Sequence, residues 1–470
     1  MDLIFNINKN NRSTLLNKFG NNFLLLKFTF WISLLGLFFS MILTHLFGQP
    51  ILIYYIFYIL VFVMLVFLFI PKFNLKFSGV SKNVFVFILY IIVITLPLTL
   101  INNHFTAFFV FCKNQLMPIL LFLFYLKSIK NIEQLIAFLK IIIKGGVIFA
   151  GYICLEFANK LFNIFPFFNQ IIAEYFVMNE NDSVGSYMNP DNFDIQGLIR
   201  PLGLEISFTA SGFFLTSIFF LLVISGHRFI KSANFKTFLV ILLYISTIVT
   251  TSRQNIFALH LLLFLFYIIL IKKKYLFNKI YIKSCKKYVF YVFMTLFIII
   301  SIIILSNISN YLEFLTETSG GTGSILSNDL VELPSSLFII FMRYPINGLL
   351  GIGAYTSSLP GMYFQLPPIN ELHFLLDIFY LLGMIGFIIY WSIFITSVYT
   401  CWRAFLIKNS IFCKYKDLYL YGVFIGLLFI INIVHYAPIG LSVNFIISLI
   451  PLLSVFARKE ILKSRVLKAK

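Results

Sequence analysis

The sequence predicts an all-α polytopic membrane protein of about twelve transmembrane helices, with two long loops on one side of the membrane. Of its 470 residues, 60% are hydrophobic and only 11% are charged, and the mean hydropathy is +0.96. A soluble domain is nearer half apolar and a quarter charged. Apolar runs long enough to cross a bilayer core of roughly 30 Å recur along the chain, and basic residues fall in alternate loops between them.

The expected spans make up a single integral membrane domain, 1–470, and most are joined by short connections. In chain order they are 28–47, 51–70, 83–100, 105–126, 136–156, 204–224, 235–250, 254–271, 288–306, 374–399, 418–435 and 438–456. The close pairs around Thr251 and Tyr436 could instead form re-entrant hairpins. The residues before the first span are polar and basic, so that span is expected to serve as the membrane signal.

Lysine and arginine mark one side of the membrane. Most of the 36 basic residues lie in the N-terminal tail, alternate loops and the C-terminal tail, whereas most of the 17 acidic residues do not. Loops rich in Lys and Arg remain in the cytoplasm. The sequence therefore predicts that both termini are cytoplasmic, and the net charge of +19 reflects membrane topology rather than nucleic-acid binding.

Two loops on the opposite side are long, at 157–203 and 307–372. Loops of this length in a compact protein are usually functional or partly helical covers. The cysteines lie in apolar runs or basic loops and show no zinc-binding spacing, so no metal is expected. The chain shows no internal repeat, which disfavours a transporter built from repeated halves.

Two of the few cations on the outer side fall where a helix is expected to begin. Arg200 precedes Pro201, which suits the first turn of the sixth span. Arg253 follows Thr251 and Ser252, which are N-cap candidates for the eighth span. Both spans run inward, so their free N–H groups and positive dipole ends face outward. Arginine adds planar, bidentate donors, and the pattern therefore predicts an anion site.

Ionisable side chains lie close to the same side. His373 and Asp377 lie at the expected start of the tenth span, and Glu205 lies near the start of the sixth. Ionisable groups within a span are usually functional or paired, which singles out Asp377. The structural alternatives are that His373 caps its helix, that Glu205 complements the helix dipole, and that the arginines anchor helix ends at the membrane surface.

The second long loop contributes a further arginine, Arg343, in Arg343-Tyr-Pro-Ile-Asn-Gly348. Gly351 and Gly353 follow, and glycine permits close approach of the backbone to a ligand. The residues by themselves therefore predict a site for an anionic ligand on the outer face, and they leave the ligand unnamed.

At these residues the chain resembles the bacterial O-antigen polymerase and O-antigen ligase superfamily. The stretch from Arg200 to Ser207 is similar to the family's Arg-x-x-Gly-x-x-Glu-Pro-Ser pattern, shortened and without the proline, and Ser252-Arg253 resembles the Ser-Arg that opens a span. Two further likenesses are Pro345 to Gly353, similar to the family's Pro-x-x-Gly-x-Gly segment, and His373 with Gly383 and Gly386, similar to its His followed by Gly-x-x-Gly. The resemblance covers roughly residues 195–400.

The resemblance implies a GT-C-like, metal-independent glycosyltransferase without a cofactor, working at the periplasmic face of the bacterial inner membrane. Its donor would be an undecaprenyl-diphosphate-linked oligosaccharide, and its protein partners a chain-length regulator (co-polymerase) and a flippase. The residues expected to bind the diphosphate are Arg200, Arg253 and Arg343. The candidates for the general base are His373, Asp377 and Glu205.

Three activities fit this expectation, with O-antigen polymerase first. A polymerase joins lipid-linked repeat units of lipopolysaccharide O-antigen. A ligase would instead transfer the chain to lipid A-core, and a lipid-linked oligosaccharide flippase would move it across the membrane. A flippase should place ionisable groups near the membrane midplane and keep external loops short, which this chain does not.

Overall fold

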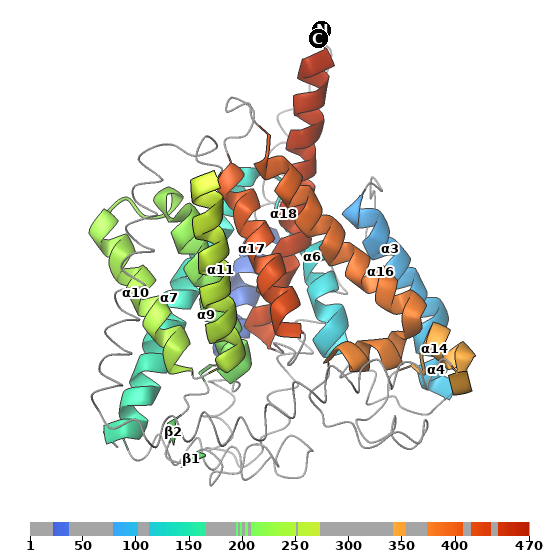
Figure 1. Cartoon of the computed structure of the whole chain (residues 1–470), viewed down its shortest axis with the longest axis horizontal. Coiled ribbons are helices and arrows are strands. Elements are labelled where there is room, and N and C mark those ends of the chain that lie inside the picture. The colour runs from blue at the N-terminus through green and yellow to red at the C-terminus, as the bar shows by residue number, and fades with distance from the viewer. Residues whose placement is uncertain are drawn as a thin grey trace, which may run out of the picture.

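The computed structural model describes residues 22–36, 79–101, 112–162, 164–165, 194–195, 198–199, 203–204, 208–250, 252–272, 342–353, 374–407, 415–433 and 440–469. Apart from one pair of two-residue strands, the regular structure in these ranges is helical (Figure 1). The chain is therefore an all-α membrane protein, as its composition predicts.

The elements follow one another in a simple order. They are the helix Asn22–Gly36, α3 (Val80–Tyr90), a π-helical turn (Ile91–Thr95), α4 (Leu96–Ile101), a second π-helical turn (Cys112–Leu116), α6 (Met117–Ser128), α7 (Ile132–Phe162), β1 (Asp194–Ile195), β2 (Leu198–Ile199), α9 (Phe208–Ser225), a 3-10 turn (Gly226–Arg228), α10 (Ala233–Val249), α11 (Arg253–Lys272), α14 (Pro345–Leu350), α16 (Phe374–Phe405), α17 (Lys416–Ile433) and α18 (Leu441–Ala469). β1 and β2 pair in antiparallel fashion.

Six of the described helices are long and apolar enough to cross a membrane. They are Val80–Ile101, Ile132–Asn159, Thr209–Arg228, Gln254–Lys272, Ile378–Phe405 and Lys416–Ile433. Three shorter apolar helices, Asn22–Gly36, Met117–Ser128 and Ala233–Val249, coincide with further expected spans. The spans expected at 51–70 and 288–306 lie outside the described residues, so the total of twelve stays a prediction.

Helix α9 is the central helix of one half of the bundle. It packs against α7, α10, α11 and α17, and every residue from Thr209 to Gly226 is buried. A helix that is apolar on every face is suited to complete burial. Aromatic rings fill its contact with α11 and α17, where the ring of Phe424 lies 5.3 Å from Phe220 and 5.7 Å from Phe266.

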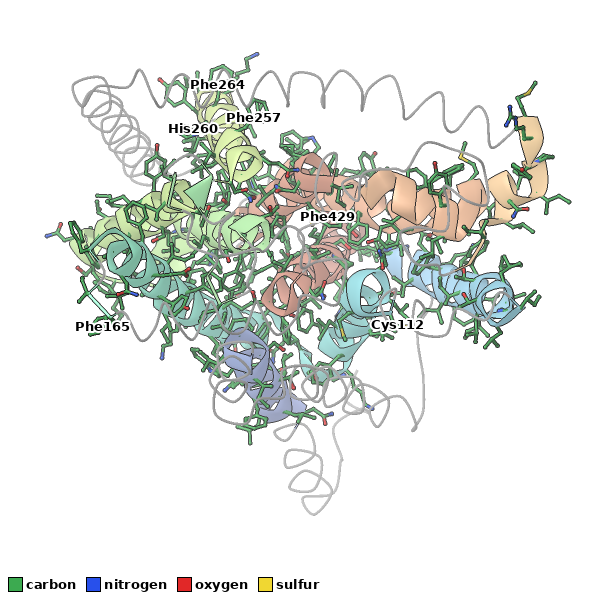
Figure 2. The ribbon with its side chains drawn as sticks, turned by 90° about the horizontal axis from the view of Figure 1, so that it is seen from below. Cys112, Phe165, Phe257, His260, Phe264 and Phe429 are labelled. Carbon is green, nitrogen blue, oxygen red and sulfur yellow. The ribbon has the colours of Figure 1, made fainter. Side chains whose placement is uncertain are left out.

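Helices α16, α17 and α18 pack on one another and form the second half, with α3 and α14 on the far side of α16 (Figure 1). The rings of Phe394 and Phe429 meet 4.9 Å apart between α16 and α17. Figure 2 shows Phe429 inside the bundle, whereas Phe257 and Phe264 of α11 lie at its rim. These two rings are 63% and 55% exposed, as expected for side chains that face lipid.

Two helices are interrupted within the membrane-spanning region. The π-helical turn Ile91–Thr95 joins α3 to α4 just before Pro97, whose missing N–H breaks the regular hydrogen-bond ladder. Helix α16 breaks at Gly383, where φ is 64°. Its first segment, Phe374–Leu382, runs across the lower end of the bundle before the helix turns upward (Figure 1).

The bundle has two chemically different ends. At the lower end in Figure 1, α9 and α11 begin and α7, α10 and α17 end; at the upper end, α10 and α17 begin and α9, α11, α16 and α18 end. The upper end carries basic residues. The pKa of Lys130 is lowered by its burial and, to a smaller extent, by the nearby charges of Lys127 and Lys459. The pKa falls because burial and nearby positive charge both disfavour the charged ammonium.

An ion pair joins two elements at the upper end. The guanidinium of Arg228 donates two hydrogen bonds to the carboxylate of Asp417, one from Nη2 at 2.6 Å and one from Nε. Asp417 lies in the first turn of α17, where a negative charge also favours the helix dipole. The pair therefore joins the turn after α9 to the start of α17.

The boundaries of α9 and α18 illustrate how the helices differ from the sequence prediction. Helix α9 begins at Phe208, so Pro201 does not occupy its first turn, and Gly203–Leu204 forms a separate turn before it. Helix α18 continues to Ala469, whereas the last span is predicted to end at 456. Good helix formers extend it beyond the apolar run, and Lys463 pairs with Glu460 at 3.0 Å.

Candidate functional site

Polar side chains are buried at the lower end of the bundle, where α7 ends beside α9 and where α11 and α17 meet. The residues are Glu156, Thr209, Ser211, Ser252, Asn255 and Asn432, with the half-buried Gln254 beside them. We call this group the lower polar cluster. Its members come from four helices and from Ser252, just before α11, so the cluster exists only when these helices have assembled.

Asn255 joins α11 to α9 within the cluster. Its side-chain amide donates to the Thr209 carbonyl at 2.9 Å and to the Ser252 hydroxyl at 2.7 Å. Gly212 faces it, and a Cβ at Gly212 would lie 2.6 Å from Nδ2. The asparagine therefore needs a glycine opposite, and the two residues let α9 and α11 approach closely.

Gln254 joins the same end of α11 to α17. Its amide nitrogen donates to the Ile431 carbonyl at 3.2 Å and to the Asn432 carbonyl. Asn432 in turn donates to the Leu428 carbonyl at 2.9 Å. The oxygens Oε1 of Gln254, Oδ1 of Asn255 and Oδ1 of Asn432 are buried and have no hydrogen-bond partner among the described residues. Buried acceptors of this kind are costly, and a ligand hydroxyl or a water would satisfy them.

A buried carboxylate, Glu156, lies near the end of α7 and is 2% exposed. Its Oε2 accepts a hydrogen bond of 3.0 Å from the backbone N–H of Gly203. Gly203 has a φ of 73°, and a Cβ there would lie 2.5 Å from the Ser211 hydroxyl of α9. The turn Gly203–Leu204 thus contacts both α7 and α9. Sequence reasoning missed Glu156; a carboxylate in an apolar run close to its outer end is the signal that could have found it.

Glycines bring two of the predicted segments together on the α14 side. Gly351 (φ 83°) and Gly383 (φ 64°) lie backbone against backbone, so a Cβ on either would overlap the main chain of the other segment. The Ile352 N–H donates to the Tyr380 carbonyl at 2.8 Å. The Tyr90 hydroxyl lies 2.9 Å from the Leu350 carbonyl and 2.5 Å from that of Leu382. We call this contact the glycine crossing.

The structure gives these glycines a different role from the one the sequence suggests, which is to let the backbone approach a ligand. Gly351 approaches the backbone at Gly383, and a Cβ at Gly353 would lie 2.7 Å from the Thr99 backbone nitrogen. Gly386 faces the ring of Tyr90, which would lie 2.5 Å from its Cβ. In the described part of the chain, these glycines therefore allow contacts within the protein itself.

Of the predicted site residues, three lie on described backbone. Arg253 is the first residue of α11, as expected for a cation at a helix N-terminus, and it lies between Ser252 and Gln254 of the lower polar cluster. Asp377 lies on the first segment of α16, which crosses the lower end. Arg343 is exposed just before α14. Arg200, Glu205 and His373 lie outside the described residues.

The structure does not bring Arg343 to the start of α11. In both views α14 lies at one side of the bundle and α11 at the other (Figures 1 and 2). A single diphosphate contacted by Arg253 and by Arg343 therefore receives no support from the described backbone.

One further ionisable pair lies inside the bundle. His260 of α11 contacts the Ile256 carbonyl through Nδ1 at 2.7 Å and the Tyr244 hydroxyl of α10 through Nε2 at 3.1 Å. A carbonyl can only accept, so Nδ1 carries the proton and Nε2 accepts from the tyrosine. Both ring nitrogens are thus used in joining α10 to α11.

The described residues contain no group of three His, Cys, Asp or Glu side chains that could hold a metal ion. Comparisons with known proteins do not assign the chain: no protein-family model, no curated protein and no solved structure matches it. What the chain does must therefore be argued from its own residues.

Proposed function

We propose that this protein is an O-antigen polymerase, a glycosyltransferase of the bacterial inner membrane that joins undecaprenyl-diphosphate-linked repeat units at the periplasmic face. The observation that carries the proposal is the lower polar cluster. It lies directly beside two of the segments that resemble the family, at Gly203–Leu204 and at Ser252–Arg253. Buried hydrogen-bonding groups that converge at one end of an apolar bundle are typical of a binding site for a polar ligand.

The cluster also has the chemistry that a saccharide needs. The unpartnered atoms of Gln254, Asn255 and Asn432 are all acceptors, and sugar hydroxyl groups are donors. The N-terminus of α11 next to them begins with Arg253, where the helix dipole and a guanidinium favour a phosphate. A lipid-linked sugar diphosphate has both features, with hydroxyl groups on the sugar and negative charge on the diphosphate.

In the proposed reaction, a hydroxyl of one lipid-linked repeat unit attacks the anomeric carbon of the donor chain. A new carbon–oxygen bond forms while the bond to the diphosphate breaks, and the electron pair leaves with undecaprenyl diphosphate. The proton of the hydroxyl passes to a base, for which His373, Asp377 and Glu205 are the candidates. Arg200 and Arg253 stabilise the charge on the leaving diphosphate. We rank Arg343 after them because α14 lies away from the start of α11.

A complementation experiment tests the proposal. We expect deletion of the gene to leave lipopolysaccharide capped with one repeat unit, and the wild-type chain to restore the polymer ladder. Arg253→Ala should abolish the ladder at normal expression, because removing a charge-stabilising group costs about 100-fold or more in rate. Arg403→Ala, at the end of α16 away from the lower polar cluster, is the matched control.

The same gel separates the other activities. Bare core after deletion would indicate a ligase, and accumulation of lipid-linked units on the cytoplasmic leaflet would indicate a flippase. Full ladders from Arg200→Ala, Arg253→Ala and His373→Ala, each with expression verified by blot, would contradict the assigned site.

A further inference from the structure

The buried carboxylate Glu156 has a position that membrane packing alone does not explain. It lies about 36 Å along α7 from Ile132, which places it at the far end of a membrane-spanning helix. The side chain is 2% exposed although the helix could have carried an apolar residue there. Burying a carboxylate is costly unless hydrogen bonds or charges stabilise it, so such residues usually have a specific partner.

One partner of Glu156 that the structure shows is the backbone N–H of Gly203. Oε2 of Glu156 lies 3.0 Å from the nitrogen of Gly203. Gly203 adopts a φ of 73°, and a Cβ there would lie 2.8 Å from Cδ1 of Ile153 as well as close to Ser211. The turn can therefore take this position only as glycine, with α7 on one side and α9 on the other.

The anchored turn lies in the middle of the segment that carries the site candidates. Arg200 is three residues before Gly203, and Glu205 is two residues after it. Leu204 is 3% exposed, so the turn is held by packing as well as by the hydrogen bond. The turn Gly203–Leu204 is therefore a fixed point between α7 and α9.

We propose that Glu156 is a positioning residue of the transferase site, and that its hydrogen bond to Gly203 holds the turn Gly203–Leu204 in place beside the lower polar cluster, where the donor binds. This inference rests on the proposed function. It adds a residue from α7, which lies outside every segment that resembles the family. The chemical class of ligand is a sugar diphosphate carried on a lipid.

The experiment measures polymerisation by the full-length protein in lipid nanodiscs, at varied concentrations of the purified lipid-linked repeat unit. Glu156→Ala removes the acceptor, and Glu156→Gln keeps an oxygen that can accept from Gly203. Gly203→Ala disturbs the turn from the other side. Glu133→Ala, an exposed acidic residue in the first turn of the same helix, is the control.

We expect Glu156→Ala and Gly203→Ala to raise KM for the donor about tenfold with a smaller change in kcat, because a misplaced turn beside the lower polar cluster weakens binding of the donor. Glu156→Gln should stay within about threefold of wild type, and Glu133→Ala should match wild type. If Glu156→Ala does not fold, Glu156→Asp replaces it. That variant shortens the side chain by one methylene, and we expect its KM to rise.

Two results would overturn the inference while leaving the proposed function standing. One is a wild-type KM for Glu156→Ala, or for Glu156→Asp where that variant replaces it. The other is a loss confined to kcat that Glu156→Gln shares, which would make the carboxylate a proton acceptor. Absence of polymer from the wild-type protein would instead overturn the proposed function itself.

Discussion

At the scale of single residues, glycine decides where segments of this chain can touch. Gly351 and Gly383 both have positive φ, a region that other residues rarely adopt, and each would place a Cβ against the backbone of the other segment. The sequence shows the glycines but not their partners, which lie about thirty residues away along the chain. Their role is therefore a matter of packing that only the folded chain reveals.

Replacing either glycine tests this role. We expect Gly351→Ala and Gly383→Ala to destabilise the protein by about 2 kcal/mol or more, since both strain the backbone and force the segments apart. Gly151→Ala is the matched control, because a Cβ there meets no atom within 4 Å and alanine is the better helix former. The midpoint of thermal unfolding in detergent measures the effect. Equal midpoints for Gly351→Ala and Gly151→Ala would refute the glycine crossing.

At the scale of elements, polar contacts hold helices together at both ends of the bundle. The Arg228–Asp417 pair joins the turn after α9 to α17 at the upper end, and Gln254 joins α11 to α17 at the lower end. The side chain of Asp417 is 9% exposed, so the ion pair is largely shielded from water. Hydrogen bonds and ion pairs are stronger where water is scarce, and losing one partner there is correspondingly costly.

The ion pair can be tested against an exposed one. We expect Asp417→Asn to lower stability by about 3 kcal/mol, because it leaves the Arg228 guanidinium without its counter-charge. Glu460→Gln removes the acid of the exposed Glu460–Lys463 pair, which is worth at most about 0.5 kcal/mol. Thermal unfolding of both variants in the same detergent gives the comparison, and a loss of similar size in both would show that the upper-end pair contributes little.

At the scale of the whole molecule, the two ends of the bundle differ in charge and in buried polarity. The described cations Lys127, Lys130 and Lys459 gather at the upper end, and the lower polar cluster lies opposite. By the positive-inside rule the basic end of a membrane protein faces the cytoplasm, which leaves the end with the lower polar cluster facing outward. On this ground we propose that the lower end faces the periplasm.

Cysteine labelling tests that topology in a variant without the native cysteines. Met342→Cys lies at the lower end and Lys463→Cys at the upper end, and both native side chains are well exposed, at 70% and 66%. We expect a membrane-impermeant maleimide to label Met342→Cys in cells with a permeabilised outer membrane. Lys463→Cys should react only after the inner membrane is opened. The reverse pattern would invert the orientation and place the lower polar cluster in the cytoplasm.

The sequence predicts only part of the candidate site. The position of Arg253 at the start of α11 follows from Thr251 and Ser252, because capping residues act locally in the sequence. The start of α9 was misplaced, because Pro201 suits a helix start but equally suits the turn that precedes one. Glu156 was missed, because what distinguishes it is its contact with Gly203, which lies well beyond the helix in the sequence.

The sequence by itself determined the class of this protein. Apolar runs of membrane-crossing length and the distribution of basic residues specify an all-α membrane protein, because the bilayer imposes both on any chain that spans it. The tertiary structure alone decided which residues meet. Glu156 reaches Gly203, Asn255 reaches Thr209, and Gly351 reaches Gly383, while Arg343 stays away from α11. Such contacts depend on how helices pack side by side, and hydropathy carries no information about that arrangement.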